Sequence, residues 1–274
     1  MKLCTFQVDT PVGRQRRIGV VLDSSIVDAT AASVAHLAGR YSPEGAARIG
    51  HARVPPDMIA LLGTGGDALD WVRECVDAAS ARGQARTASG ETIVYASDQV
   101  RLLSPIPRPP GIACFITWPA HIEDSREKGF AMLSFPPRDG DLRAYYKGNA
   151  DSVGDPGSTI PMPPYATEMD IECEMAAVVG TRGKDMTVEE ARKAIAGYVI
   201  FNDVSYRAIQ AREMACGLGP TKGKDPDGSN VIGPWIVTAD EVGDPQDVDR
   251  DQRRRAFVLQ HERNGLGLRR PGIL

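Results

Sequence analysis

Two glutamates one residue apart lie in an otherwise mostly apolar run over residues 169–180, MDIECEMAAVVG. The run is typical of a buried strand. Because side chains alternate across a strand, Glu172 and Glu174 share one face of it. Two adjacent carboxylates repel each other and resist burial unless positive charge lies between them. The pattern therefore predicts a strand that carries a cation site, most simply for a divalent metal ion. The side chains on the opposite face are those of Ile171, Cys173 and Met175.

A third carboxylate, Asp203, lies in a second apolar run over residues 197–205. If the two runs pair as neighbouring strands, this carboxylate joins the two glutamates. Carboxylate oxygens suit a hard cation, so the expected cofactor is Mg²⁺ or Mn²⁺ rather than zinc. Taken without their neighbours, the two glutamates are more typical of a solvated sheet face, because charged side chains usually lie in water.

The composition is that of an ordinary globular protein. The chain has 274 residues, of which 42% are hydrophobic and 25% are charged. No apolar run approaches the roughly 18–20 residues of a membrane span. Asp9 interrupts the first apolar segment where a signal peptide would continue, so a cytoplasmic location is expected. The five cysteines form no C-x-x-C pair, and we expect them to be reduced and to fill apolar space.

Many strand signals and few, short helix signals predict a β-rich α+β fold. Residues 1–105 are interpreted as a small N-terminal β-containing domain with its linker. They open with a hairpin around a turn at residues 23–25. They end in a proline-dense stretch that is expected to be extended. Helices are expected over residues 56–63 and 66–81.

Residues 106–249 are interpreted as the main domain. The stretch 131–165 is rich in Pro, Gly and Asp and is predicted to be mostly loop. Thr187 and Glu190 form the capping-box pattern at the start of a helix. After residue 249 the character changes, because residues 250–274 carry seven arginines against two acidic residues and show no strand or helix periodicity. The main-domain strands are expected over residues 111–117, 169–180, 197–205 and 231–238, and the helices over 119–130, 187–196 and from about 205.

Four stretches of the main domain follow one another in a recognisable order. They are Tyr146-Lys-Gly-Asn, the Glu-x-Glu run, Gly197-Tyr-x-x-x-Asn-Asp-Val-Ser-x-Arg-x-x-Gln210, and Gly223-Lys224 followed by Gly233-Pro-Trp235. Together they resemble the fumarylacetoacetate hydrolase family over about residues 111–245. The resemblance implies a mixed β-sandwich roll preceded by a smaller N-terminal domain. It also implies a role in breaking down small organic acids, including those from aromatic compounds.

The resemblance implies that Glu172, Glu174 and Asp203 bind the metal ion. Some members of the family add a fourth ligand, an aspartate seven residues before the catalytic histidine. Here the histidine is His121, and the fourth-ligand position holds Cys114. The chain therefore resembles the branch of the family with three carboxylate ligands.

The family resemblance also implies the catalytic groups. His121 is the general base, and a carboxylate three residues later orients it. Asp124 holds that place, with Glu123 as the alternative. Lys224 is the implied stabiliser of the developing enolate, and Lys222 is its neighbour in the same loop. Judged without the family, His121 is more typical of a surface histidine and Lys224 of a solvated loop lysine.

Tyr146, Arg207 and Gln210 match substrate-contacting positions of the family, although packing and salt bridging explain them equally well. The implied substrate is a small 2-oxo or β-diketo acid, and relatives commonly form a homodimer. No membrane or nucleic-acid partner is expected, because the arginines at 253–255 lack interleaved aromatic residues. The leading hypothesis is metal-dependent hydrolysis of a carbon–carbon bond in an acylpyruvate-type acid. Decarboxylation of a 2-oxo acid or isomerisation of a 2-hydroxydienoate at the same site is the alternative.

The C-terminal end motivates a third hypothesis. Members of the family continue with further strands, including a Gly-Thr-Gly-type segment, and residues 250–274 contain no such segment. The pattern is typical of a chain that is cut short or read in a shifted frame. The last strands of the roll are then expected to be missing, and the chain would be a truncated, non-catalytic member of the family.

Overall fold

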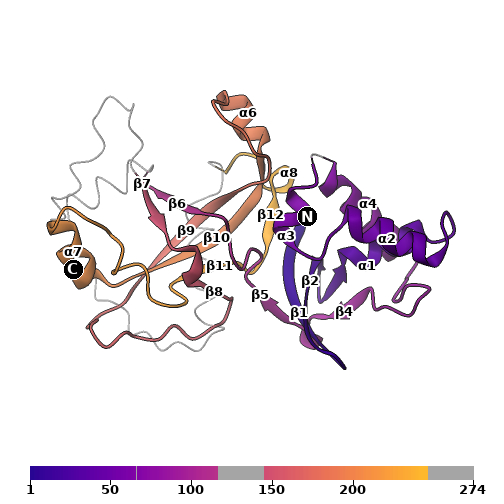
Figure 1. The fold of residues 1–274 in the computed structure, drawn as a ribbon, viewed down its shortest axis with the longest axis horizontal. Helices are drawn as coiled ribbons and strands as arrows, with labels where there is room; N and C mark the ends of the chain where they lie inside the picture. The colour runs from indigo at the N-terminus through magenta and orange to yellow at the C-terminus, as the bar shows by residue number, and fades with distance from the viewer. Residues whose placement is uncertain (66, 117–144, 246–274) are drawn as a thin grey trace.

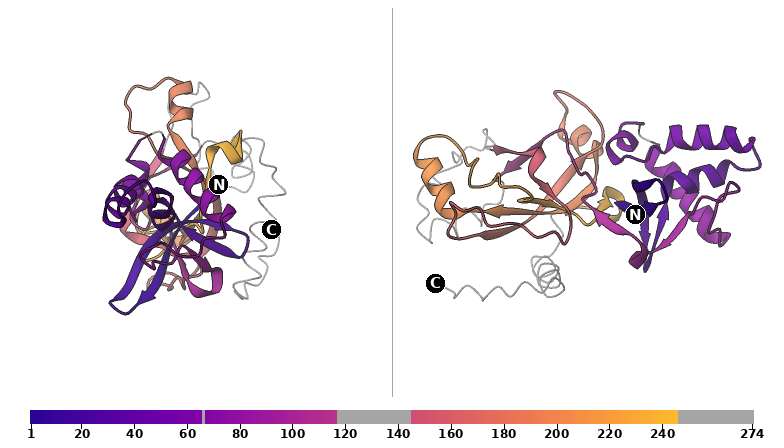
Figure 2. Two further views of the ribbon diagram at one scale, coloured as in Figure 1. Left: turned by 90° about the vertical axis from the view of Figure 1, so that its right-hand side faces the viewer. Right: turned by 60° about the horizontal axis from the view of Figure 1, so that its bottom comes forward.

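The structure is a computed structural model, and residues 1–65, 67–116 and 145–245 are described. The molecule is elongated, with N-terminal and C-terminal halves at opposite ends of its long axis (Figure 1). The helices of the N-terminal half and the orange helix near residue 210 lie far apart in a second direction of view as well (Figure 2, right). Among the described residues, no helix is both long enough and apolar enough to cross a membrane.

The N-terminal half begins with two long paired strands, residues 2–10 and 13–22. The predicted hairpin follows, because the second of these strands pairs with residues 25–28 across a tight turn in which Asp23 has a φ of 48°. Asp57 caps the predicted helix that ends at Gly63. The elements are β1 (Lys2–Thr10), β2 (Gly13–Leu22), β3 (Ser25–Asp28), α1 (Ala29–Leu37), α2 (Pro43–Arg53), α3 (Met58–Leu62), α4 (Ala68–Ala81), β4 (Val94–Ala96), η1 (Ser97–Gln99) and β5 (Arg101–Leu103).

The C-terminal half is built around two long neighbouring strands, both of which were expected from the acidic runs. The capping box of Thr187 and Glu190 forms, and its helix ends at Lys193 rather than 196 because the next strand begins at Ile195. The elements are β6 (Ile112–Phe115), β7 (Tyr145–Gly148), η2 (Ala150–Ser152), β8 (Val153–Gly154), β9 (Asp170–Val179), α6 (Val188–Lys193), β10 (Ile195–Ser205), α7 (Arg207–Ala215), β11 (Asn230–Ile232), β12 (Ile236–Thr238) and α8 (Ala239–Val242).

One sheet runs through both halves. Its described strands follow the order β4-β3-β2-β1-β12-β10-β11-β8, with β5 beside β1 and β9 beside β10. Strands β6 and β7 form a separate antiparallel pair. The described part of the chain is therefore α+β and rich in strands, as the sequence predicts.

Strand β1 joins the two halves. Lys2 pairs with Val237 and Leu3 with Ile236, so the sheet continues across the domain boundary predicted near residue 105. The hydrophobic core continues as well, because Val72 of the N-terminal half and Phe201 of the C-terminal half belong to one cluster of buried side chains. The two halves are therefore connected by hydrogen bonds and by apolar packing. The domain boundaries near residues 105 and 249 stay a prediction.

Two secondary-structure predictions were wrong in detail. The segment expected to be mostly loop contains β7, which pairs with β6 from 30 residues upstream. The single strand expected over 231–238 is divided into β11 and β12. Both pieces pair with β10, and the chain bulges between them at Gly233, which has a φ of 137°, and Pro234, which has no N–H for the ladder.

Strand β9 is buried on one face only, whereas the sequence predicts a buried strand. Glu172, Glu174 and Val178 point inward, while Met175 is 41% and Val179 is 68% exposed. In the described part of the chain β9 pairs with β10 alone, so it lies at an edge of the sheet. The acidic face of the strand is thus the more buried one, which intensifies the need for compensating positive charge.

Candidate metal and catalytic site

The site lies where two pairs of strands face each other. In the antiparallel register of β9 and β10, Glu172 lies directly opposite Asp203, and opposed residues share a face of the sheet. In β6 and β7, Cys114 lies opposite Tyr146. The thiol of Cys114 and the hydroxyl of Tyr146 both donate to Oδ2 of Asp203. The two strand pairs therefore meet at this aspartate.

Asp203 is the buried centre of the site, with none of its surface exposed. Its Oδ2 accepts from Tyr146 and from Lys224 Nζ at 3.0 Å, and Cys114 Sγ lies 3.8 Å away. Its Oδ1 accepts no hydrogen bond from any described residue. Burial raises the pKa of Asp203, although Lys224 and Tyr146 oppose the shift. An unpartnered buried oxygen costs roughly 1–3 kcal/mol, and more when it is charged, so this atom favours a bound cation.

Both oxygens of Glu172 already bind cationic side chains. Its Oε1 lies 2.6 Å from Arg207 Nη1, and its Oε2 lies 2.6 Å from Lys224 Nζ. Burial acts to raise the pKa of Glu172, but Lys224 and Arg207 outweigh it and the pKa is lowered. Glu172 is therefore the ionised carboxylate that holds Lys224 in place.

Glu174 has a different environment. Its Oε2 accepts the thiol of Cys114 at 3.2 Å, and no described cation pairs with it. Burial, reinforced by the negative charges of Glu172 and Asp203, raises the pKa of Glu174 to about 7. A divalent cation at this point would relieve both the burial cost and the repulsion between carboxylates.

The structure places Lys224, and not Lys222, among the carboxylates. Lys224 is only 4% exposed, whereas the ammonium of Lys222 lies over the ring of Tyr165 at 4.4 Å from its centroid. The loop that carries Lys224 is anchored by Glu213 of α7, whose carboxylate accepts the backbone N–H of Lys222 at 2.6 Å and of Gly223 at 2.7 Å. The sequence does not predict this role of Glu213, because an acidic residue near the end of a helix shows no pattern that indicates what its side chain contacts.

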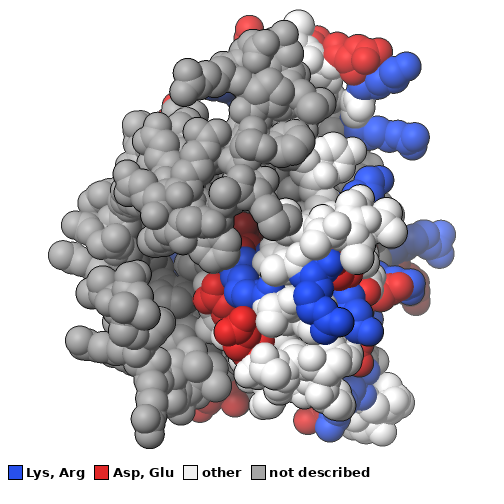
Figure 3. All heavy atoms as spheres, turned by 90° about the vertical axis from the view of Figure 1, so that its left-hand side faces the viewer, with Lys and Arg blue, Asp and Glu red and all other residues white. Residues whose placement is uncertain are grey.

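Arg207 and Gln210 lie beside this cluster. The guanidinium of Arg207 donates to Oδ2 of Asp170 from Nε at 2.8 Å and from Nη2 at 2.7 Å. Its Nη1 also donates to Gln210 Oε1 at 3.0 Å. Asp170 was not among the predicted residues, although its spacing of two from Glu172 was a usable signal. On this end of the molecule acidic and basic side chains lie side by side (Figure 3).

The predicted base His121 and its partners Glu123 and Asp124 lie outside the described residues. The structure thus brings together seven of the predicted site residues and leaves the base a prediction. The seven are Tyr146, Glu172, Glu174, Asp203, Arg207, Gln210 and Lys224.

The donor atoms present suit a divalent cation. One atom each from Cys114, Glu174 and Asp203 lie within 4.8 Å of one another. Two of these donors are carboxylate oxygens, which Mg²⁺ and Mn²⁺ prefer. With the unpartnered Oδ1 of Asp203, this set fits the metal that the resemblance implies.

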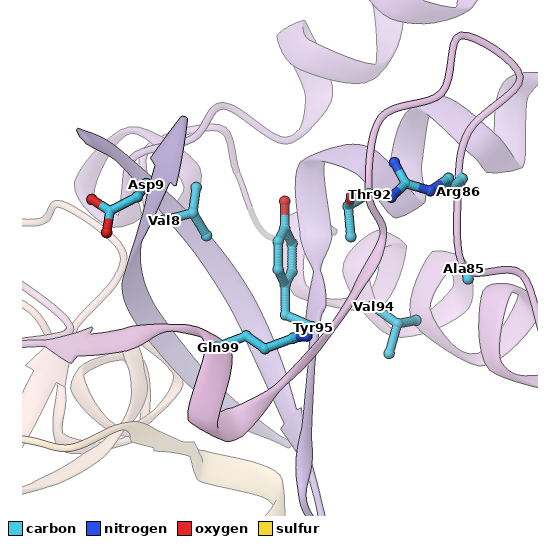
Figure 4. Close-up of a pocket in the computed structure, with 8 residues that line it drawn as sticks. All are labelled: Val8, Asp9, Ala85, Arg86, Thr92, Val94, Tyr95 and Gln99. Atoms are coloured by element: carbon cyan, nitrogen blue, oxygen red, sulfur yellow. The ribbon is translucent and has the colours of Figure 1, made fainter. Parts of the chain in front are cut away.

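A separate hollow of about 500 Å³ lies in the N-terminal half. The side chain of Tyr95 projects into it between Val8 and Thr92, and its charged lining residues are Asp9 and Arg86 (Figure 4). None of the predicted site residues lines it, so its size does not make it the site of the carboxylate chemistry.

Comparison with known proteins identifies the family of the chain. The model of the fumarylacetoacetate (FAA) hydrolase C-terminal family matches residues 118–264, more than half of the chain, and it runs past the change of character predicted at residue 249. The 2,4-didehydro-3-deoxy-L-rhamnonate hydrolase of Sphingomonas sp. is 41% identical over 98 residues, which are 36% of this chain and 33% of that protein. Human mitochondrial oxaloacetate tautomerase FAHD2A is 28% identical over 175 residues, which are 64% of this chain and 52% of that protein.

Among solved structures, the maleylpyruvate hydrolase of Sphingobium sp. SYK-6, in complex with manganese(II) and pyruvate, has a TM-score of 0.55 and 23% identity. The alignment covers 89% of this chain and 70% of that one, which establishes the fold. The alignments with the two curated relatives span about a third and about half of those proteins' lengths. By its family match, its fold and its acidic strands, the chain belongs to the fumarylacetoacetate hydrolase family.

Proposed function

We propose that the protein is a divalent-metal-dependent hydrolase that cleaves a carbon–carbon bond in a small β-diketo or acylpyruvate-type acid. One observation carries the proposal. Asp203 is fully buried with an unpartnered oxygen, and it lies next to a second carboxylate, Glu174, that has no cationic partner among the described residues. A buried arrangement of this kind is stabilised by a cation that the protein itself does not supply.

Glu174 and Asp203 would hold the metal, with Glu172 beside them on the same sheet face. When bound, a divalent cation supplies Lewis acidity toward a substrate carbonyl. Mn²⁺ is present in the related maleylpyruvate hydrolase, and this supports either Mn²⁺ or Mg²⁺ here. Arg207 offers a cationic guanidinium to an anionic substrate at the edge of the site, and Tyr146 lies beside it with its hydroxyl donating to Asp203.

Lys224 would stabilise the charge that develops during cleavage. A water that loses its proton to His121, the base that the family resemblance implies, adds to the distal carbonyl. The carbon–carbon bond then breaks, and its electron pair moves to the 2-oxo acid fragment as an enolate. The ammonium of Lys224, held within 3.0 Å of two carboxylates, is positioned to offset this negative charge before the enolate takes up a proton.

Mn²⁺- and Mg²⁺-dependent cleavage of a set of acylpyruvates tests the proposal. The double variant Glu172→Gln, Glu174→Gln should lose at least about a hundredfold in kcat/KM, because a Lewis-acidic ion contributes several kcal/mol. The matched control is Glu168→Gln, Glu189→Gln, which removes the same charge from exposed positions and should retain wild-type rates. Equal rates in the two double variants would sink the proposal. A wild-type chain that neither binds these ions nor cleaves any acid would instead fit the non-catalytic alternative.

A second function at the same site is isomerisation or decarboxylation. It is favoured by the similarity to human oxaloacetate tautomerase, which matches a longer part of this chain than the rhamnonate hydrolase does. All of these reactions pass through an enolate next to Lys224. Product analysis separates them, because hydrolysis yields two acids, decarboxylation yields carbon dioxide, and tautomerisation changes neither the mass nor the carbon skeleton of the substrate.

A further inference from the structure

Cys114 packs against the edge of the apolar core and also faces the site. Side chains of β6 alternate between exposed and half-buried, and Cys114 lies on the inward face opposite Tyr146. Its Sγ lies 3.2 Å from Glu174 Oε2 and 3.8 Å from Asp203 Oδ2. A cysteine that merely fills space is expected to contact apolar groups alone, whereas the sulfur of Cys114 also contacts two carboxylates.

The three side chains are close enough to share one ion. Their donor atoms lie within 4.8 Å of one another. Ligands bound to one cation at about 2.0–2.3 Å are separated by up to roughly 4.5 Å, so a small adjustment of side chains completes the geometry. An independent sign of a missing ligand is the buried Oδ1 of Asp203, which has no partner among the described residues.

Glu172 is the alternative third donor, and it is less accessible to an ion. Both of its oxygens are within 2.6 Å of cationic nitrogens, those of Arg207 and Lys224. A metal ion bound by Glu172 would have to displace one of these nitrogens. The sulfur of Cys114 meets no such competition, because its polar contacts among the described residues are the carboxylates of Glu174 and Asp203 and the hydroxyl of Tyr146, none of which is a cation.

We propose that Cys114 is a metal ligand, so that the site combines one thiolate sulfur with carboxylate oxygens of Glu174 and Asp203. The proposal rests on the metal dependence of the proposed function and deepens it. On binding, the ion takes the place of the thiol proton, which passes to the solvent, and no group is oxidised or reduced. Thiolate is a soft ligand and favours Co²⁺, Zn²⁺ or Cd²⁺ over Mg²⁺ and Mn²⁺. The metal preference of this site therefore differs from that of a site made of carboxylates alone.

Cobalt(II) binding detects a sulfur ligand directly. A cobalt–thiolate bond gives an intense charge-transfer absorption in the near ultraviolet that oxygen ligands do not give. Titration of the wild-type protein with Co²⁺ should produce this band and saturate at one equivalent. The Cys114→Ser variant should lose the band, and its affinity for Cd²⁺ should fall at least about tenfold while its affinity for Mg²⁺ changes less than threefold. The matched control is Cys216→Ser, which removes an exposed thiol and should keep the band.

A band that survives in Cys114→Ser, or unchanged affinity for Cd²⁺ in that variant, would overturn the assignment. Thermal melts of Cys114→Ser and Cys114→Ala establish that the variants are folded, and the wild-type band is informative whether or not they are. Acylpyruvate cleavage with Mg²⁺ and no cobalt–thiolate band in the wild type would leave the proposed function standing and reject the sulfur ligand. Absence of binding by any divalent ion would reject both.

Discussion

The molecule contains two buried clusters of opposite charges, one in each half, and they differ in how completely they are satisfied. In the N-terminal half, Asp28 is fully buried, but each of its oxygens has a partner. Oδ1 accepts the N–H of Ala31 at 2.9 Å, and Oδ2 lies 3.0 Å from Arg17, which also pairs with Glu91. The unpartnered side-chain atom within that cluster is Arg17 Nε, a donor that cannot bind a cation.

The cluster of the C-terminal half has too few cations for its acids. Asp203 keeps an unpartnered oxygen, and Glu174 has no cationic partner among the described residues. Both clusters contain a fully buried aspartate paired with a basic residue, so burial of charge by itself does not distinguish a structural cluster from a functional one. The distinguishing feature is the combination of a buried carboxylate oxygen without a donor and a neighbouring carboxylate without a cationic partner, both among the described residues, because a bound cation would offset the cost of both.

The largest expected effect comes from removing the basic residue of each cluster. Lys224→Met and Arg17→Met should each lower the free energy of unfolding of the metal-free protein by about 3–5 kcal/mol, because each leaves buried carboxylates without compensation. Mn²⁺ should stabilise Arg17→Met only as much as it stabilises wild type, so that the difference between these two proteins is unchanged, whereas it should stabilise Lys224→Met more than wild type and so reduce that difference. Urea denaturation with and without MnCl₂ measures both effects. Equal rescue of the two variants would remove the distinction between the clusters.

A proton should compete with the metal at Glu174, whose pKa burial raises to about 7. In a Cys114→Ser background, where no thiol proton contributes, affinity for Mn²⁺ should fall roughly tenfold between pH 8 and pH 6, because metal ligands must be deprotonated. Isothermal titration calorimetry at the two pH values measures the change. Adding Glu174→Gln should weaken binding and flatten the pH dependence, and a wild-type-like pH profile in that variant would contradict the assignment to Glu174.

The raised pKa of Glu174 affects the stability of the metal-free protein in the opposite direction from metal affinity. The folded state holds the Glu174 proton more tightly than the unfolded chain does, for which the ordinary pKa is 4.5. The free energy of unfolding should therefore decrease as the pH rises from about 4.5 to 7, because the unfolded chain binds fewer protons in that window.

The smallest effect is expected at an exposed acid that has neither burial nor an unpartnered oxygen. The backbone N–H and the hydroxyl of Thr187 both donate to Glu190 and lower its pKa. The stability that these hydrogen bonds contribute is therefore present above the pKa of Glu190 in the unfolded chain, and it is lost as the pH falls through the lower pKa of Glu190 in the folded protein. Thr187→Ala should cost about 0.5–1 kcal/mol, as expected for an N-cap. Mn²⁺ affinity should not change, and a calorimetric titration that showed a change would extend the metal-sensitive region beyond the buried cluster.

The sequence predicts the two acidic strands and their convergence well, because alternation of side chains follows directly from strand geometry. It also distinguishes Lys224 from Lys222 through the neighbouring motif. It does not reveal β7, which is four residues long within a loop-like composition and is paired with a distant strand. The proposed role of Cys114 is not expected from the sequence either, because the family resemblance places this cysteine at the fourth-ligand position, where it is interpreted as a sign of a site with three carboxylate ligands only. These features depend on which strands face each other, and local patterns contain no such information.

The pairing of β1 with β12 has a consequence for synthesis on the ribosome. The first strand of the chain emerges long before residues 236–238, and until those residues are made it cannot complete the sheet. Over that interval the edge of β1 that faces away from β2 can pair only with β5. An exposed strand edge invites association with other nascent chains. The pairs of Lys2 with Val237 and of Leu3 with Ile236 can therefore form only after β12 has been translated, and a stalled product that ends before Ile236 would leave this end of β1 unpaired on that edge.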